Sequence, residues 1–94
     1  MQTRLFFASI QPEKDAEVSE VLNELIPRIR ASNGCLKVQV LQSGDALVGI
    51  TDWDSEESLA AYADGELAIE LFTRITPRLM GAPITRSYES KLVL

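Results

Sequence analysis

The sequence predicts an α+β fold in which two helices cover one face of a four-stranded antiparallel sheet. Short runs rich in branched and aromatic residues, typical of strands, occur at four places along the chain. Two longer segments with apolar residues at helical spacing lie between them, in the order β-α-β-β-α-β. Of the 94 residues, 46% are hydrophobic and 24% are charged, as in an ordinary globular protein. We therefore expect residues 1–94 to form one domain.

The first half of the chain is predicted to contain one strand and one long helix. Residues 3–10, "TRLFFASI", are typical of a strand. A helix is expected over residues 14–32, with Asp15 suited to its N-cap. Its core face would consist of Val18, Val21, Leu22, Leu25 and Ile29.

Two residues affect the second half of this helix. Pro27 falls on the polar face, where water can satisfy the carbonyl of Asn23, so we expect a bend and no break. Gly34, in the "NG" pair, is expected to supply the left-handed residue after the helix end.

A hairpin is predicted next. Residues 35–42, "CLKVQVLQ", alternate in hydrophobicity, which places Leu36, Val38 and Val40 on one face of a strand. "SGD", residues 43–45, is a typical hairpin turn, and "ALVGITDW", residues 46–53, is the returning strand.

The second helix and the last strand complete the fold. Asp54 or Ser55 is expected to cap the helix, which Gly65 interrupts before the apolar pattern resumes. Residues 84–94 are predicted to form a strand with Ile84, Arg86 and Tyr88 on one face. This order of elements is the split βαβ arrangement, a ferredoxin-like fold.

Apolar residues are predicted on both faces of the sheet. Phe6 and Phe7 are adjacent, as are Leu47 and Val48, and adjacent strand residues point to opposite faces. Two helices can cover only one of these faces. An exposed apolar sheet face usually marks an interface, so we expect a second copy to pack on it as a symmetric dimer.

The composition excludes several classes of function. The net charge is −5 and the basic residues are scattered, which argues against nucleic acid as a partner. There is no histidine and one cysteine, Cys35, which excludes Cys/His zinc sites, a histidine-ligated haem and histidine-containing triads within one chain. No segment is long and apolar enough for a membrane span. A single cysteine and no signal-peptide pattern predict a cytoplasmic protein.

Three stretches together resemble the antibiotic biosynthesis monooxygenase domain. They are "NGC" after the first helix, "DWDSEESLAAY" at the start of the second, and "ITPRLMGAP" at its close. The resemblance covers nearly the whole chain. It implies a dimeric α+β barrel with a pocket between sheet and helices. It also implies oxidation of an aromatic quinol or naphthol by dioxygen, with no metal or flavin cofactor.

Trp53 is the position that the resemblance carries over most directly, and it has two interpretations. It could stack on a planar aromatic substrate, or it could be a core plug over the second helix. Tyr62 lies where many relatives have a histidine, and could donate a hydrogen bond to a substrate oxygen or simply pack. Phe72, on the apolar side of the second helix, is assigned to substrate binding with Trp53 and Tyr88.

Arg86 is the polar residue of most interest, because it shares a strand face with apolar neighbours. It could hold a phenolate or carboxylate, form a salt bridge, or extend to water. We expect Arg86 and Trp53 to reach the same cavity. Cys35 is interpreted as a small buried residue and the acidic run after Trp53 as a helix cap.

Two functional hypotheses follow. In the first, a cofactor-independent oxygenase uses Arg86 and Tyr62 as catalytic residues that stabilise a phenolate, while Trp53, Tyr88 and Phe72 bind the ring. In the second, the dimer binds a small molecule or serves in assembly without catalysis. The absence of histidine and of a pocket asparagine favours the second hypothesis, because Asn23 is expected on a polar helix face and Asn33 in a turn. The resemblance favours the first.

Overall fold

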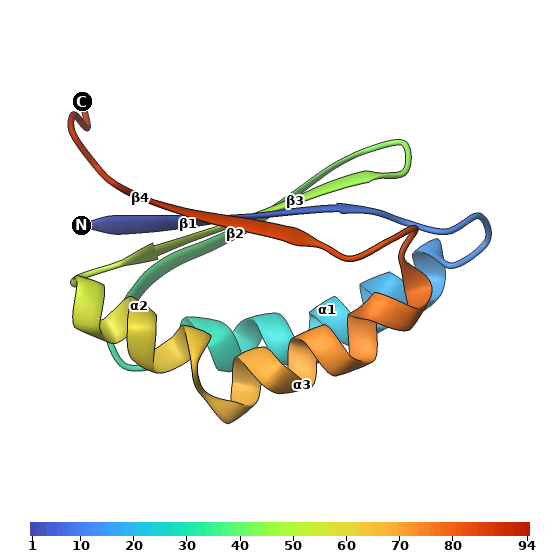
Figure 1. Ribbon diagram of the computed structural model, residues 1–94, viewed down its shortest axis with the longest axis horizontal. Coiled ribbons are helices and arrows are strands. Elements are labelled where there is room, and N and C mark those ends of the chain that lie inside the picture. Colours follow the sequence, from blue (N-terminus) through green and yellow to red (C-terminus); the bar gives the residue numbers. More distant parts are fainter.

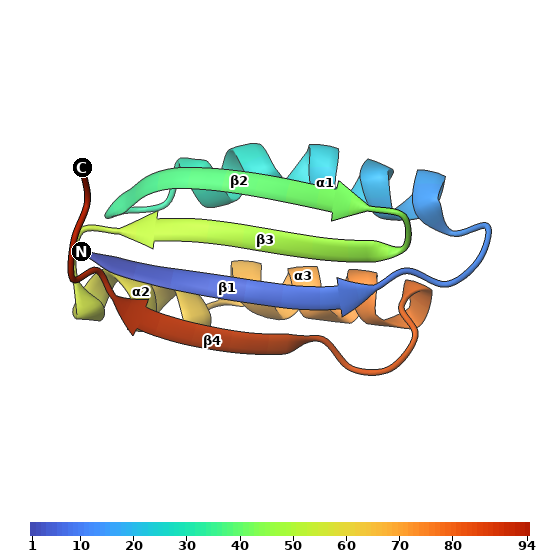
Figure 2. The ribbon, with the colours of Figure 1, turned by 90° about the horizontal axis from the view of Figure 1, so that it is seen from above.

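The computed structural model describes all 94 residues and has the predicted ferredoxin-like architecture. One four-stranded antiparallel sheet, ordered β2-β3-β1-β4, is covered on one face by the helices (Figures 1 and 2). α1 runs under the β2 side of the sheet, and α2 and α3 run under the β4 side. The strands are β1 (Gln2–Ser9), β2 (Cys35–Ser43), β3 (Ala46–Trp53) and β4 (Ile84–Glu89), and the helices are α1 (Asp15–Arg30), α2 (Glu56–Ala63) and α3 (Glu66–Ile75). A 3₁₀ turn, Thr76–Arg78, follows α3.

α1 differs from the prediction at both ends. Asp15 is its first helical residue and not its cap, because Lys14 occupies the N-cap without a side-chain hydrogen bond. The helix continues through Pro27, as expected. Gly34 has the predicted left-handed backbone, with φ of 83°, but it lies beyond the C-cap residue Ala31 and belongs to the loop that enters β2.

The hairpin and the second helical region follow the prediction closely. β2 and β3 are joined by a two-residue loop in which Gly44 has a φ of 59°. The register shifts between Cys35 and Lys37, so Leu36 falls in a bulge and is exposed, whereas Val38 and Val40 face the helices. Ser55 caps α2, and its Oγ accepts a hydrogen bond from the Ser58 N–H at 3.1 Å.

The core lies between the sheet and the helices. The largest fully buried side chains are Trp53, Leu25, Ile29, Ile75 and Val18. Val18, Val21, Leu25 and Ile29 form the buried stripe of α1, which confirms the helical spacing seen in the sequence, whereas Leu22 is only half-buried.

The opposite face of the sheet carries no helix, and we call it the open face (Figure 1). Its side chains come from alternate residues of each strand, as the pairing of Leu5 with Ile50 and with Arg86 shows. Phe7, Leu41, Ile84 and Tyr88 are all exposed there. Apolar residues on both faces of the sheet are thus confirmed.

The predicted last strand is shorter than expected. β4 ends at Glu89, and residues 90–94 turn away from the helices (Figure 1). The Ser90 N–H still donates to the Met1 carbonyl at 2.9 Å. None of the helices has the length and apolar character needed to cross a membrane.

Ion pairs join α1 to the helix beside it. Arg74 contacts Glu24 at 2.6 Å and Glu70 at 3.2 Å, and Arg28 contacts Glu70 at 3.3 Å. These contacts are largely exposed, so each contributes little stability, but together they fix the spacing of α1 and α3 on the outer surface.

Gly34 offers a test of how tightly the loop before β2 packs on α2. A Cβ at this position would lie 2.3 Å from Ser58 Oγ and 2.6 Å from Asp54 Oδ1, in addition to the strain of a positive φ. Gly44 also has a positive φ but has no neighbour within 4 Å of such a Cβ. We expect Gly44→Ala to lower the free energy of unfolding by about 1–2 kcal/mol through backbone strain alone.

Gly34→Ala should cost a further 1–3 kcal/mol or so, because the loop or Ser58 must move. Urea unfolding of both variants measures the difference. Equal losses for the two variants would mean that this loop does not pack closely on α2.

Candidate functional site

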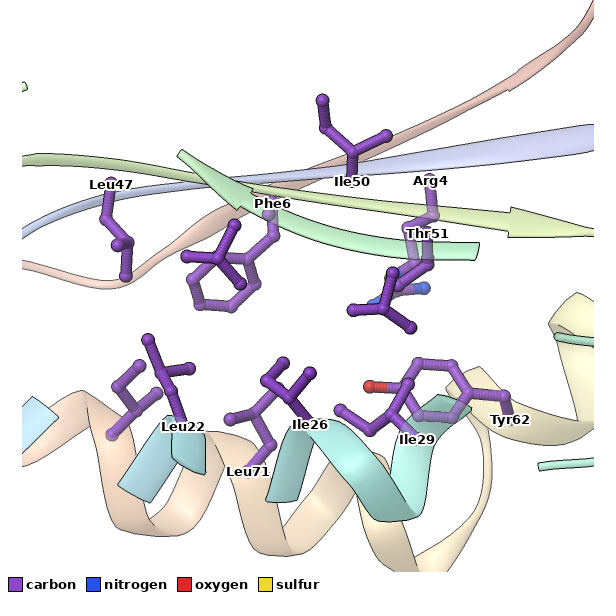
Figure 3. A pocket seen from close by; sticks show the side chains of 14 residues that line it. Arg4, Phe6, Leu22, Ile26, Ile29, Leu47, Ile50, Thr51, Tyr62 and Leu71 are labelled. Atoms are coloured by element: carbon purple, nitrogen blue, oxygen red, sulfur yellow. The ribbon is translucent and has the colours of Figure 1, made fainter. Parts of the chain in front are cut away.

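A cavity of about 50 Å³ lies between the sheet and the helices (Figure 3). Of the 14 residues that line it, 11 are hydrophobic. The helix side is formed by Leu22, Ile26 and Ile29 of α1 with Leu71 and Ile75 of α3. The cavity is therefore an apolar space in the middle of the core layer.

Space for the cavity exists on the sheet side because Gly49 has no side chain there. A Cβ on Gly49 would lie 3.4 Å from Phe6 Cβ, so an alanine would fit and would fill part of the space. Ile50, although next to the cavity, directs its side chain to the open face (Figure 3).

The polar groups of the cavity gather at one end. Arg4 of β1 extends from the sheet toward Tyr62 of α2, and Thr51 lies beside them (Figure 3). The Arg4 side chain makes no ion pair in this structure, although four other arginines contact carboxylates or carbonyl oxygens. Arg4 is half-buried, so this end of an apolar cavity has a positive charge with no partner.

Trp53 does not line the cavity. It is 0% exposed, and its indole N–H donates to Thr51 Oγ1 at 2.9 Å. Its ring stacks on Tyr62, with ring centroids 4.9 Å apart and planes 23° from parallel. The core-plug interpretation describes this position, and the tryptophan acts on the cavity by holding the Tyr62 ring.

Phe72 also does not line the cavity, but it contacts a residue that does. It is half-buried on α3 and meets Phe6 edge to face, with centroids 5.6 Å apart and planes at 72°. Phe6 is the ring that faces the cavity, and Phe72 holds it in place.

Arg86 and Tyr88 lie on the open face, so the expectation that Arg86 shares a cavity with Trp53 is wrong. Arg86 pairs with Leu5 and Tyr88 with Thr3, and these β1 residues point away from the helices. Both side chains are exposed. The alternation along β4 was predicted correctly, but it does not specify which of its two faces meets the helices.

Arg4 is the residue that the sequence analysis missed. Strand alternation places it on the same face as Phe6, two residues later, so an arginine two residues from a core phenylalanine was a usable signal. Thr51 was missed for the same reason, since it shares a face with Trp53 and Leu47.

Burial raises the pKa of two groups in the core layer, and one of them, Tyr62, lines the cavity. Burial raises the pKa of Tyr62, and the charge of Arg4 opposes this rise only in part. Burial also raises the pKa of the Cys35 thiol, which is free and lies in the core. Cys35 is therefore a neutral packing residue, as expected, and Tyr62 remains a hydrogen-bond donor at neutral pH.

Comparison with known proteins identifies a family. The family described as antibiotic biosynthesis monooxygenase matches residues 1–73. None of the curated proteins compared with the chain matches it.

Solved structures share the fold at low sequence identity. A conserved protein from Methanosarcina mazei Go1 is 22% identical, with a TM-score of 0.87 over 97% of this chain and 94% of its own. An antibiotic biosynthesis monooxygenase is 18% identical, with a TM-score of 0.85 over 96% and 98%. A protein of unknown function from Nitrosomonas europaea is 19% identical, with a TM-score of 0.83 over 99% and 91%.

The environment of Tyr62 can be tested by titration. The chain has two tyrosines, so Tyr88→Phe leaves Tyr62 as the only phenol. We expect its ultraviolet titration midpoint to lie above the usual value of 10.0, because burial disfavours the phenolate.

Linkage gives the matching stability effect. With a raised pKa in the folded state, Tyr62 contributes stability below pH 10.0 that is lost as the pH rises toward the folded-state value. The melting temperature of Tyr62→Phe should therefore fall less steeply above this pH than that of Tyr88→Phe. A titration midpoint at or below 10.0 would mean that Tyr62 is exposed to water in solution.

Proposed function

The chain belongs to the antibiotic biosynthesis monooxygenase family, and on that premise we propose that it oxygenates an electron-rich phenol held in the cavity between sheet and helices. The observation that carries this proposal is the half-buried Arg4, without an ion-pair partner, beside Tyr62 at the polar end of an apolar space. The aromatic ring would occupy the apolar part. Its oxygen would lie between the Arg4 guanidinium and the Tyr62 hydroxyl.

This arrangement favours the ionised phenol. A nearby positive charge and a hydrogen bond to the phenolate both lower the pKa of a bound phenol. A phenolate gives an electron to dioxygen far more readily than a phenol does. Because the groups are fixed in a largely apolar setting, their effect on the bound anion exceeds what water provides.

The proposed chemistry takes all its electrons from the substrate. One electron passes from the phenolate to dioxygen, and the resulting radicals combine through a new carbon–oxygen bond. Cleavage of the oxygen–oxygen bond then leaves one oxygen atom in the product as a quinone carbonyl and releases the other as water. For 1-naphthol, one molecule and one dioxygen give one 1,4-naphthoquinone and one water. No metal or organic cofactor enters this balance.

The residues assigned from the sequence take different parts in this proposal. Tyr62 keeps its role as a hydrogen-bond donor to the substrate oxygen. Trp53 positions Tyr62, and Phe72 positions Phe6. Arg4 takes the place of Arg86 as the fixed positive charge, because Arg86 and Tyr88 could reach a ligand only on the open face.

The alternative is a domain that binds a small molecule without catalysis or serves in assembly. The small size of the cavity favours the assembly role, which needs no ligand in the core. An apolar cavity of ~150 Å³ admits benzene, whereas the one here has about 50 Å³. A substrate ring therefore requires wall side chains to move.

Oxygen consumption tests the first proposal. We expect dioxygen uptake with 1-naphthol and formation of the quinone, followed by its absorbance. Arg4→Gln should lower kcat/KM about 100-fold, the usual effect of removing one anion-stabilising group. Arg86→Gln makes the same change on the open face and should leave it unchanged.

The outcomes separate the hypotheses. Loss of activity in Arg86→Gln and not in Arg4→Gln would return the catalytic role to Arg86. Binding of naphthols without oxygen uptake would establish the non-catalytic alternative.

We also propose that two copies pair through their open faces. Each copy would be a single domain over residues 1–94, located in the cytoplasm. Phe7, Leu41, Ile84 and Tyr88 give this face an apolar surface that a symmetric partner would bury. The free, buried cysteine suits a reducing compartment.

Two isoleucines with nearly equal exposure make a matched test of the dimer. Ile84 on the open face is 57% exposed and Ile69 on α3 is 59% exposed. We expect light scattering to give the mass of two chains for the unmodified protein and for Ile69→Lys. Ile84→Lys should shift the mass toward one chain, because each symmetric interface would bury two lysines. A one-chain mass for the unmodified protein, or equal behaviour of the two variants, would contradict pairing through this face.

A further inference from the structure

The cavity is separated from the surface by very little on its α1 side. A groove of about 410 Å³ runs along the outside of the molecule between α1 and the edge strand β2. We call it the seam groove, and it is lined by Ser19, Leu22, Asn23, Ile26, Pro27, Val40 and Gln42. Three of these residues, Leu22, Ile26 and Val40, also line the cavity.

These three side chains form a thin wall between two spaces. Each of them is half-buried, whereas the neighbouring core residues Val21 and Leu25 of α1 are buried. A change of rotamer in Leu22 or Ile26 moves only apolar atoms and leaves no hydrogen bond broken. The cavity can therefore be enlarged in this direction at low cost.

The hydrogen bonds between α1 and β2 lie only at the two ends of the seam groove. At one end Gln42 Nε2 donates to Asp15 Oδ1 at 2.9 Å, and at the other Arg30 Nη1 donates to the Cys35 carbonyl at 2.8 Å. No side-chain hydrogen bond or ion pair joins the two elements between these points. On its other side α1 is joined to α3 by the ion pairs of Arg74 and Arg28. α1 can therefore move away from β2 more easily than from α3.

A second groove touches the cavity but is a weaker candidate. It lies where the loop after α1 meets α2 and α3, and it shares only Tyr62 with the cavity. Tyr62 is held by its stacking on the fully buried Trp53, so opening there would disturb the core.

We infer that the seam groove and the cavity form one elongated site for a neutral, fused-ring aromatic that enters between α1 and β2. This inference rests on the proposed function for the position of the inner hydroxyl. Leu22 and Leu47 lie at one end of the cavity, and Arg4 and Tyr62 at the other (Figure 3). A molecule entering past Leu22 and Ile26 therefore directs its leading end to Arg4, and its trailing end stays in the groove.

The rim of the groove specifies the trailing end. Ser19, Asn23 and Gln42 offer hydroxyl and amide groups, and no charged residue lines the groove. Gln42 uses its amide nitrogen on Asp15 and Gly44, which leaves its side-chain oxygen as an acceptor. Pro27 has no N–H, so the Asn23 carbonyl lacks its usual helical donor. This rim fits hydroxyl or carbonyl groups and not a carboxylate or phosphate. Asn23, interpreted from the sequence as a residue of a polar helix face, thus lines the proposed site.

The test uses naphthalene-2,6-diol, whose two hydroxyls lie at opposite ends of two fused rings. Binding is measured under nitrogen, by methyl chemical shifts and by titration, so that it is independent of oxidation. We expect the diol to shift the methyl signals of Leu22, Ile26 and Val40. Ser19→Phe, which places a ring in the groove from an exposed helix position, should weaken binding about tenfold or more. Ala16→Phe adds the same ring to exposed α1 surface outside the groove and should have no effect.

Each outcome decides the inference. Shifts confined to Leu67 in the second groove, or to Leu5 and Val48 on the open face, would overturn it, as would no binding or an equal effect of the two phenylalanine variants. Diol binding that Ser19→Phe weakens, without oxygen uptake in air, would support the site and refute the oxygenase. Oxygen uptake that Ser19→Phe leaves unchanged would support the oxygenase and refute the proposed site.

Discussion

The alternation of side chains along β1 determines which residues line the cavity and which lie on the open face. β1 has this influence because it lies between β3 and β4 and pairs with both. Arg4 and Phe6 point to the helices and line the cavity, whereas Leu5 and Phe7 point to the open face. A register shift of one residue would exchange the two sets and put an arginine among the exposed apolar residues. The edge-to-face contact of Phe6 with Phe72 supports the observed register, because a one-residue shift would turn Phe6 to the open face and remove it.

The residues around the cavity form a fixed part and a compliant part. Trp53, Tyr62 and the cap of α2 form the fixed part, with a buried indole hydrogen bond, a stacked ring pair and a Ser55 cap. Leu22 and Ile26, half-buried on α1, form the compliant part. A site that must admit a ring and then hold its oxygen in a defined place needs both properties. Here they are found at opposite ends of one cavity.

Local signals in the sequence determine most of the fold and little of the site. Helical spacing identified the buried stripe of α1, and the turn and cap chemistry identified the hairpin and the start of α2. The face of a strand that meets the helices depends on pairing between distant segments, and the alternation of β4 reads equally well in both orientations. Arg86 was therefore placed on the wrong side, while Arg4 went unnoticed beside Phe6. The bulge at Leu36 and the groove beside Asn23 likewise arise from how α1 and β2 meet, which neither segment specifies alone.

The burial of Trp53, the only tryptophan, makes intrinsic fluorescence a probe of the core. The Trp53 indole has no exposed surface, so we expect its emission in the native state to be shifted to the blue. Its partner in the stack, Tyr62, is at a centroid distance of 4.9 Å, where excitation passes efficiently from phenol to indole. Because Tyr62 is also a wall of the cavity, a molecule that enters next to it changes the light emitted by a residue it never touches. Occupancy of the cavity can thus be followed without any label.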